Sequence, residues 1–249
     1  MIAQMYIMWL RQLKRYWRSK PRMIGALGQP VLFLVALGFG LGPVFQRAGE
    51  GDYVTFLAPG IIGMSILFTG MFTGIEVIWD RQFGFLKETL VAPVSRVQIM
   101  IGRTLGGATI AVGQGILVLL ISLAIGFHVE NWALLPLALL FMALIAVLFT
   151  AFGTAIASKL TDMHAFPLII NFLIMPIFFL SGALFPLRDL PQALSVIISF
   201  NPLAYGIDGL RAALTSSAEF SVVTSLAVMC SVTIVIVLLG SYLFSKIEV

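Results

Sequence analysis

The sequence predicts an all-α integral membrane protein with six transmembrane helices. Three observations predict this fold class: an apolar composition, six long apolar stretches, and an uneven distribution of lysine and arginine along the chain. Of the 249 residues, 60% are hydrophobic and 10% are charged, and the mean hydropathy is +1.06. Because a soluble domain carries roughly 25% charged residues, a water-soluble globule is excluded, and so is intrinsic disorder.

Each apolar stretch is long enough to cross a bilayer as a helix, which needs about 20 residues. A strand of a membrane barrel would instead alternate over about ten residues. We expect the first span to be retained, because its apolar run exceeds the core of a cleavable signal peptide. The predicted spans are Met23–Phe45, Val54–Ile78, Thr104–Phe127, Trp132–Ala157, Phe166–Leu187 and Val222–Phe244.

These spans predict one transmembrane domain over residues 1–249. Its expected parts are an amino-terminal helix in 1–22, spans one to five in 23–187, an external segment in 188–221, and span six with a cytoplasmic tail in 222–249.

Lysine and arginine predict the orientation of the spans. Twelve of the 15 lie before the first span, between spans two and three, after span four, or after span six. The other connections hold only Arg47, Arg188 and Arg211. Because Lys and Arg concentrate in cytoplasmic loops, both termini are predicted to be cytoplasmic.

The amino-terminal segment predicts an amphipathic helix at the membrane surface. Aromatic and leucine side chains recur at helical spacing on one face, which is typical of a helix with Trp and Tyr at headgroup depth. The cations would face anionic lipid or a protein partner, so a surface anchor and a docking element both remain open. Pro21 is expected to break the helix before the first span. The cations are Arg11, Lys14, Arg15 and Arg18.

The longest cytoplasmic connection, residues 80–103, contains a short predicted helix at Phe85–Val91. Its large apolar side chains favour docking in a groove of another protein, because such groups rarely face water without a reason. A solvated cap over the helix bundle is the alternative. The residues expected to dock are Phe85, Leu86, Lys87, Glu88, Thr89 and Leu90.

The external connection holds two apolar segments, Ser195–Phe200 and Leu203–Leu214, which are separated by Asn201–Pro202. Neither segment is long enough to cross a bilayer. We therefore expect two half-helices that pack back into the bundle, with a surface excursion as the alternative.

Ionisable residues in the apolar regions are scarce, which argues against coupling to a proton or sodium gradient. Asp208 and Arg211, three residues apart on a helix, could pair and lower the cost of partial burial. Glu76 lies near the cytoplasmic end of the second span. It either reaches the interface or pairs with Arg15 or Arg18 of the amphipathic helix.

Small and polar residues in the spans suggest close helix contacts. Gly70–Gly74 and Gly102–Gly106 form G-x-x-x-G pairs, which suit tight packing between helices. Four polar residues could contact a substrate or bridge helices: Gln29, Thr73, Gln114 and Asn171.

The residues argue against an enzyme. The sequence has no G-x-x-x-x-G-K-[ST] loop and no H-E-x-x-H motif, and it has one cysteine and two histidines. Residues 208–212 are loosely similar to the core of membrane phosphatidyltransferases, but that chemistry needs further aspartates to hold metals, and none follows Asp208. We therefore expect no cofactor or metal in this chain.

Two stretches make the chain similar, over nearly its whole length, to the permease subunits of type-2 ABC exporters. The first is RQFGFLKETLVAPVSR at Arg81–Arg96, followed by Gly102-Arg103. The second and more specific joins FLSGALFPLRDLP at Phe179–Pro191 to NPLAYGIDGLR at Asn201–Arg211. The chain most resembles the drug-exporter and nodulation lipo-oligosaccharide-exporter permeases.

This resemblance implies a non-enzymatic permease that exports an amphipathic, lipid-like or drug-like substrate across a prokaryotic plasma membrane. Two permease copies, expected to be identical, would bind two copies of a separate ATPase that holds ATP and Mg²⁺; no nucleic acid is involved. A polysaccharide or lipo-oligosaccharide cargo is the alternative, although the absence of an obvious external aromatic cluster argues against a polysaccharide. A phosphatidyltransferase-like enzyme and a stand-alone channel are alternatives from other classes.

The resemblance also implies roles for particular residues. The amino-terminal segment would be the interface helix, Phe85–Val91 the coupling helix seated in the ATPase, and Leu190–Leu214 the external gate. The polar contact to the interface helix would involve Arg15, Arg18, Glu76 and Arg81. The gate would include Phe185, Pro186, Asn201, Pro202, Asp208 and Arg211. The substrate route would lie between the two permeases, lined mainly by spans one, two and five, and three polar residues of these spans are candidates for contact with the substrate: Gln29, Thr73 and Asn171.

Overall fold

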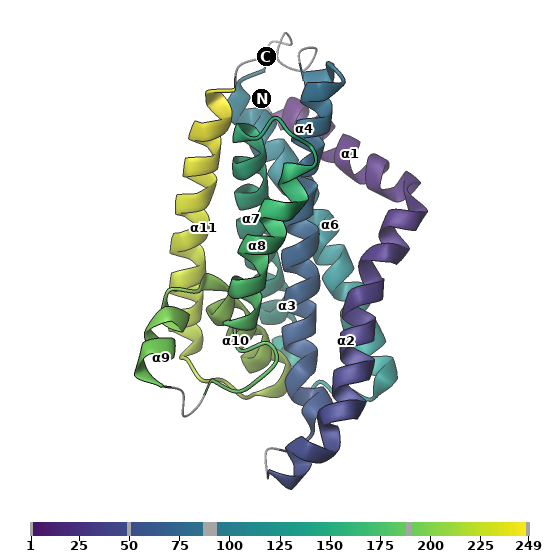
Figure 1. Ribbon diagram of the computed structural model, residues 1–249, viewed down its shortest axis with the longest axis vertical. Helices are drawn as coiled ribbons and strands as arrows, with labels where there is room; N and C mark the ends of the chain where they lie inside the picture. The colour runs from purple at the N-terminus through teal and green to yellow at the C-terminus, as the bar shows by residue number, and fades with distance from the viewer. Residues whose placement is uncertain (1, 49–50, 87–93, 188–190, 248–249) are drawn as a thin grey trace.

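The computed structural model describes residues 2–48, 51–86, 94–187 and 191–247, and all regular elements of this described part are helices (Figure 1). In chain order they are α1 (Ile2–Arg18), α2 (Lys20–Arg47), α3 (Tyr53–Thr73), α4 (Ile75–Gln82), α6 (Arg96–Ile125), the 3₁₀ turn η1 (Trp132–Leu134), α7 (Leu135–Lys159), α8 (Ala165–Phe179), α9 (Gln192–Ser199), α10 (Pro202–Thr215) and α11 (Val222–Ser245).

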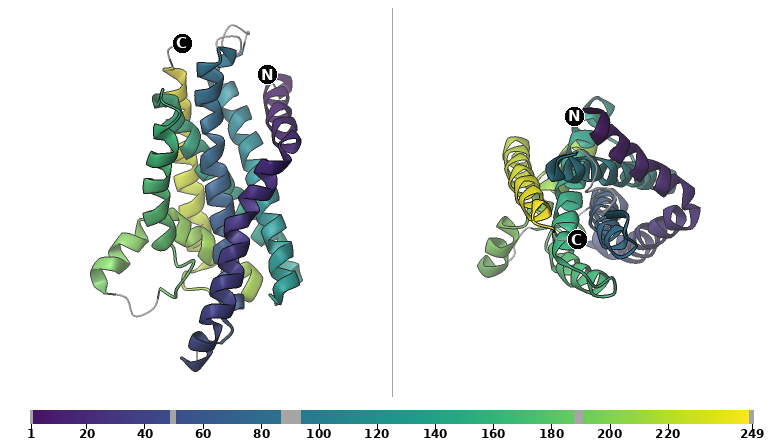
Figure 2. Two further views of the ribbon diagram at one scale, coloured as in Figure 1. Left: turned by 45° about the vertical axis from the view of Figure 1, so that its right-hand side comes forward. Right: turned by 90° about the horizontal axis from the view of Figure 1, so that it is seen from above.

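The long helices form a bundle with α3 at its centre. Helix α3 packs against α2, α6, α7, α8 and α10, and most of its residues are buried. Helices α2 and α11 lie at the outside, and few of their side chains are buried. Figure 2 shows the two outer helices on opposite sides of the bundle. An apolar outer surface of this kind is expected where lipid replaces water as the solvent.

Five helical stretches are long and apolar enough to cross a membrane, which confirms five of the six predicted spans. The remaining prediction, Phe166–Leu187, is too long: α8 ends at Phe179 and residues 180–187 form turns. Gly182, in the left-handed region with φ +71°, and Pro186 lie in these turns, and both residues disfavour a continuing helix. The bent pair α9–α10 would be a further span only if it were one broken helix.

Helices α1 and α2 meet one or two residues earlier than predicted. Ser19 interrupts the helix, with φ −98° and ψ 69°, and Pro21 lies in the first turn of α2. Proline is tolerated there because the first turn has no intrahelical acceptor for its missing N–H. The interruption lets α1 cross the outside of the bundle against α6 (Figure 2).

The G-x-x-x-G pairs lie at close helix contacts, as predicted. A Cβ on Gly102 would lie 2.9 Å from the Cβ of Met8, and one on Gly106 would lie 2.7 Å from the Cβ of Gln12. These two glycines therefore let α1 approach α6. Gly70 of α3 and Gly74, which follows α3, also lie close to α7: a Cβ on either residue would contact atoms of that helix.

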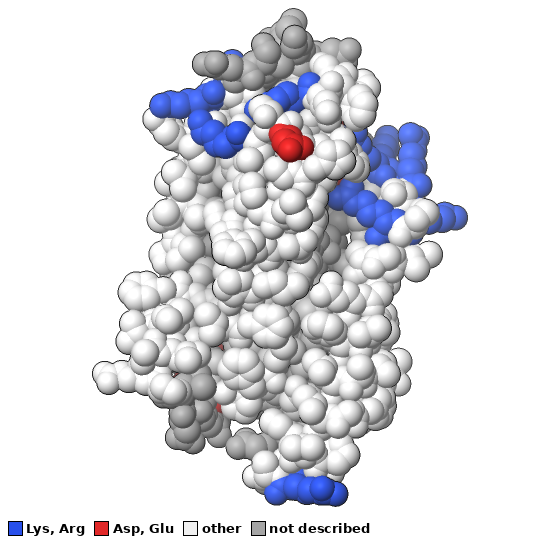
Figure 3. Space-filling model, viewed as in Figure 1, with Lys and Arg blue, Asp and Glu red and all other residues white. Residues whose placement is uncertain are grey.

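On the face shown in Figure 3, the charged side chains lie toward the two ends and the middle is uncharged. Most Lys and Arg in this view gather at the end where both termini lie, which we call the terminal end. A second basic patch lies at the opposite tip of α2, which we call the far end. The uncharged band between them is the part suited to a bilayer.

Candidate functional site

A cluster of ion pairs joins four helices near the terminal end. Glu76 and Asp80 lie one turn apart on α4, and each is only 1% exposed. Arg22 of α2 lies 2.7 Å from Glu76, and Arg15 of α1 lies 3.5 Å from Glu76 and 3.4 Å from Asp80. Two further arginines complete what we call the ion cluster: Arg11 of α1, 3.3 Å from Asp80, and Arg103 of α6, which is paired with the same carboxylate.

Arg103 depends most strongly on this arrangement. Its side chain is 3% exposed, and Asp80 supplies its ion pair. A buried charge that loses its partner is costly, so Asp80 and Arg103 act as a unit. The arginines of α1 and α2 are partly exposed instead, and water can solvate them.

The structure agrees with only part of what the sequence suggested for the surroundings of Glu76. Glu76 is buried and does not reach the surface, and Arg15 is one of its two predicted partners. Arg18, the other, is exposed and has no ion pair within the described residues. Sequence reasoning missed Asp80 and Arg103, although the spacing of Glu76 and Asp80 places both carboxylates on one helix face.

Three hydrogen bonds hold α1 and the start of α2 against α6. Trp9 Nε1 donates to Thr109 Oγ1 at 3.0 Å, and the Tyr16 hydroxyl donates to Gln114 Oε1 at 3.1 Å. Gln114 Nε2 donates in turn to the Met23 carbonyl at 3.2 Å. Burial raises the pKa of Tyr16, against a smaller opposite effect of Arg22, so the phenol keeps the proton that it donates. Gln114 therefore bridges helices.

The ends of the connection between α4 and α6 are bonded to two other helices. Arg81 donates to the carbonyls of Ser158 and Leu160, at 2.9 and 3.1 Å, at the end of α7. Arg96 donates to the carbonyls of Ser245 and Ile247, both at 2.7 Å, at the end of α11. Cations suit helix carboxyl ends, where carbonyls lack intrahelical partners. Arg81 thus binds the end of α7. Among the described residues it forms no ion pair with Glu76, its predicted partner in the polar contact to the interface helix.

The predicted docking residues are only partly described. Phe85 is 47% exposed, whereas Leu86 is fully buried in the bundle. Leu86 therefore packs inside the chain and does not present its side chain to a partner, which corrects the expectation for this residue. The other four, Lys87, Glu88, Thr89 and Leu90, lie outside the described residues.

At the far end, three side chains bind the last turn of α8 and the non-helical residues that follow it. Asn201 Nδ2 donates to the carbonyls of Ile177 and Leu180, at 2.6 and 2.8 Å. Arg211 donates to the Gly182 carbonyl at 2.9 Å, and the Tyr53 hydroxyl donates to the Leu184 carbonyl at 2.8 Å. Irregular backbone at membrane depth needs such partners within the protein.

Asn201 also shapes the bend between α9 and α10. Its Oδ1 accepts the N–H of Leu203 at 3.1 Å and so caps α10, as asparagine commonly does. Pro202 occupies the first turn of α10, and the two helix axes meet at 85°. Almost every residue of α10 is buried.

Asp208 and Arg211 form no ion pair in the described part of the chain, because each residue binds other groups. Asp208 accepts the backbone N–H groups of Glu219 and Phe220, at 2.7 and 3.0 Å. Arg211 binds backbone carbonyls and lies 4.2 Å from the centre of the Phe56 ring. Both side chains are buried, and the nearby backbone supplies hydrogen bonds that one helix face could not.

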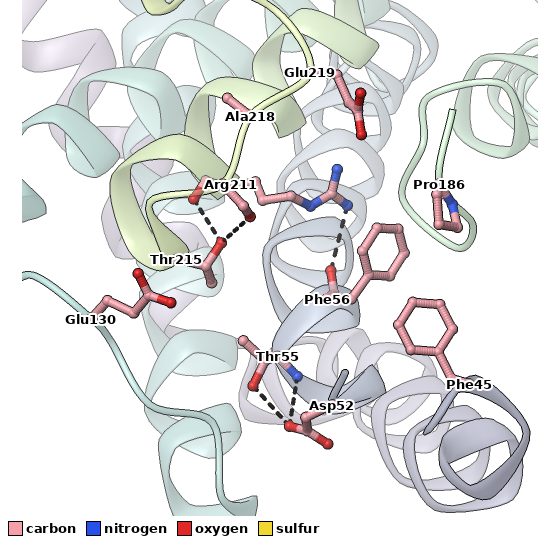
Figure 4. Close-up of a pocket in the computed structure, with 11 residues that line it drawn as sticks. Phe45, Asp52, Thr55, Phe56, Glu130, Pro186, Arg211, Thr215, Ala218 and Glu219 are labelled. Atoms are coloured by element: carbon pink, nitrogen blue, oxygen red, sulfur yellow. Dashed lines mark hydrogen bonds between the residues drawn. The ribbon is translucent and has the colours of Figure 1, made fainter. Parts of the chain in front are cut away.

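Arg211 lines a cavity of about 290 Å³ at the far end (Figure 4). Three carboxylates, those of Asp52, Glu130 and Glu219, also line it. Pro186, one of the predicted gate residues, lies across the cavity in Figure 4. Phe185 and Pro202 are half-buried beyond this lining.

An aromatic cluster, which sequence reasoning did not find, lies beside this cavity at the far end. Phe45 and Tyr53 have ring centres 4.9 Å apart, and Phe45 and Phe56 have ring centres 5.5 Å apart. The three residues come from the end of α2 and the start of α3. Phe45 lies before the connection between α2 and α3, and Tyr53 and Phe56 lie after it, so the spacing of these residues in the sequence did not reveal the cluster.

The three candidate substrate-route residues lie in different surroundings. Gln29 lines a cleft of about 410 Å³ together with Arg22 and side chains of α3. Thr73 is buried, and its hydroxyl donates to the Gly70 carbonyl of its own helix at 2.6 Å. Asn171 is exposed on α8. The structure therefore does not bring the three into one site.

A bundle of long apolar helices with an uncharged outer band is typical of an integral membrane protein. A sequence model of the ABC-2 type transporter family matches residues 3–215. The chain belongs to this family.

Individual relatives agree with this assignment. Nodulation protein J of Rhizobium leguminosarum bv. viciae is 28% identical over 226 residues, which cover 90% of this chain and 86% of the relative. The putative transport permease ycf38 of Porphyra purpurea is 32% identical over 211 residues, covering 81% of this chain and 70% of the relative. The corresponding permease of Pyropia yezoensis is 31% identical over 207 residues, with the same coverage.

Family membership settles the class of activity. The chain is a transport permease and not an enzyme, so the phosphatidyltransferase-like alternative is wrong. Membership also implies association with an ABC ATPase subunit.

Proposed function

We propose that this chain is the permease subunit of an ATP-driven exporter that moves an amphipathic, lipid-like or drug-like substrate out across a prokaryotic plasma membrane. Two permease copies would associate with two copies of a separate ATPase, which holds ATP and Mg²⁺. The observation that carries the proposal is the ion cluster. It binds α1 to α4 immediately before the connection that would meet the ATPase.

The terminal end would face the cytoplasm. Most of the lysine and arginine gathers there, in keeping with the positive-inside rule. Helix α1 would then lie along the cytoplasmic interface as the interface helix. The connection between α4 and α6 would be available to an ATPase on the same side.

Movement of that connection would reach the bundle by three routes. The ion cluster joins α4 to α1 and α6, Arg81 joins it to α7, and Arg96 joins the start of α6 to α11. A gate shifts only when a partner binds its two states unequally. An ATPase that binds differently to two positions of this connection would therefore bias the helices toward one state.

The far end would hold the external gate. Helices α9 and α10 would be re-entrant half-helices, since α10 is buried and bent away from α9. Asn201 and Arg211 bind the turns after α8, so a shift of α10 would move those turns as well.

A lipo-oligosaccharide or polysaccharide cargo is the second candidate. The resemblance of the sequence to nodulation lipo-oligosaccharide-exporter permeases and the aromatic cluster of Phe45, Tyr53 and Phe56 support it. Aromatic side chains combine an apolar face with a polar tip in tyrosine, which suits the apolar faces and hydroxyl groups of sugars.

Purification of the tagged chain from its native membrane in mild detergent tests the proposal. We expect the intact complex to weigh as two permeases with two ATPases and to hydrolyse ATP. A lone oligomer with no ATPase would contradict it and favour a stand-alone channel. Stimulation of ATP hydrolysis by an amphipathic drug, compared with a lipo-oligosaccharide, would distinguish the two cargo classes.

A further inference from the structure

A cleft of about 600 Å³ lies between α1, the start of α2 and the middle of α6. Its walls are largely apolar, with Leu13, Met23, Ile110 and Leu117 among the lining residues. The polar groups that reach it from Tyr16 and Gln114 are already hydrogen-bonded to each other. The cleft therefore offers an occupant an apolar interior.

The mouth of this cleft carries two cations, Lys14 and Arg18, which lie one helical turn apart on α1. Both are exposed, and neither has an acidic partner in the described chain. Arg11 and Arg15, on the neighbouring face of the same helix, pair with the carboxylates of the ion cluster. Glu76 and Asp80 are thus paired with Arg11 and Arg15 on one face of α1. Lys14 and Arg18, on the neighbouring face, remain available to an external anion.

The position of α1 suits a ligand that is both anionic and apolar. Figure 3 shows basic side chains over α1 directly above a broad uncharged surface. Trp17, which lies between Lys14 and Arg18 in the sequence, also lines the cleft and is 74% exposed. Tryptophan is typical of the headgroup level of a bilayer. Gly113 on α6 leaves open space, since a Cβ there would meet no atom within 4 Å.

We propose that this cleft binds one anionic phospholipid, with its phosphate at Lys14 and Arg18 and an acyl chain along α6 past Gly113. The charge complementarity distinguishes this lipid from the bulk lipids that surround any membrane protein. Each basic residue near a membrane surface contributes on the order of 1 kcal/mol of attraction to anionic lipid. This site needs neither the ATPase nor transport, so it stands or falls independently of the exporter proposal.

Native mass spectrometry of the detergent-solubilised chain tests the site. Dioleoylphosphatidylglycerol is titrated against dioleoylphosphatidylcholine, and the lipids retained per chain are counted. We expect one tightly retained phosphatidylglycerol and a clear preference over phosphatidylcholine. Lys14→Gln combined with Arg18→Gln should weaken phosphatidylglycerol retention roughly 30-fold, as two such attractions predict. Gly113→Leu, which fills the open space, should also release the lipid.

The matched control is Lys159→Gln combined with Lys246→Gln, which removes the same charge at the terminal end outside the cleft lining. This control should retain the lipid as the wild type does. Equal retention by the wild type, the Lys14/Arg18 variant and Gly113→Leu would overturn the proposal, as would equal binding of the two lipids. The same spectra report the oligomeric state. Loss of dimers in Gly113→Leu with unchanged lipid retention would show that a second copy occupies the cleft, which also overturns the proposal.

Discussion

Glu76 and Asp80 lie one turn apart in the same ion cluster, yet their partners make them unequal. Arg22 and Arg15, which bind Glu76, are partly exposed, so water can compensate them when the carboxylate is lost. Arg103, which binds Asp80, is buried in α6. A buried cation without its partner has no such compensation.

We therefore expect Asp80→Asn to destabilise the fold by about 3–5 kcal/mol and Glu76→Gln by about 1–3 kcal/mol. Thermal unfolding of the two purified variants measures the difference. Glu76→Gln should impair the coupling of ATP hydrolysis to transport more than it lowers the melting temperature. If Glu76→Gln melts as early as Asp80→Asn, then Glu76 is a structural residue and its assigned role in coupling fails.

At the scale of elements, the approach of α1 to α6 depends on glycine. A Cβ on Gly106 would overlap the side chain of Gln12, whereas one on Gly113, two turns further along the same helix, would meet open space. Gly106→Ala should therefore destabilise by about 1–3 kcal/mol through overpacking. Gly113→Ala should be neutral or stabilise by up to about 1 kcal/mol, because alanine favours a helix. Equal melting temperatures for the two variants would show that α1 is not packed on α6 as described.

The sequence predicted the helices themselves well, because a long apolar run has one stable form in lipid. It failed at the end of α8, since residues 180–187 remain apolar and hydropathy does not register the turn at Gly182. The carbonyls of these turns are bound by Asn201, Arg211 and Tyr53, which are distant in the sequence.

The polar sites were predicted less completely for the same reason. Glu76 stood out as a charge within an apolar region, but its companions Asp80 and Arg103 lie near span ends, where charges are ordinary. Local spacing suggested that Asp208 and Arg211 pair, whereas the fold offers each of them backbone partners. Such choices are made by tertiary packing and are not visible in helix periodicity.

At the scale of the whole molecule, substitutions at two adjacent residues should distinguish loss of binding to the ATPase from loss of stability of the chain itself. Phe85 is half-exposed and Leu86 is buried. Leu86→Asp should lower the melting temperature of the isolated chain, because it places a carboxylate in an apolar core. Phe85→Asp should lower the melting temperature less than Leu86→Asp does, because Phe85 is half-exposed, and it should reduce co-purification of the ATPase severalfold. If Phe85→Asp keeps full ATPase association and stimulation, this connection is not the docking element.

The proposed orientation can be measured directly on cells. In a Cys230→Ser background, Ala218→Cys places a thiol in the exposed far end, and Thr161→Cys places one in the exposed terminal end. A membrane-impermeant maleimide should label Ala218→Cys on intact cells and Thr161→Cys only after permeabilisation. The reverse pattern would place both termini outside.

The short helix α8 has a consequence for the surrounding bilayer. Its 15 residues extend about 22 Å at 1.5 Å per residue, which is less than the roughly 30 Å of hydrocarbon in an average membrane. A helix shorter than the hydrocarbon is accommodated by local thinning of the bilayer. With Phe172 and Leu168 of α8 facing outward, lipids at this face would be compressed relative to those around α11, whose helix is 24 residues long. A bilayer with shorter acyl chains should therefore fit this face of the protein with less deformation.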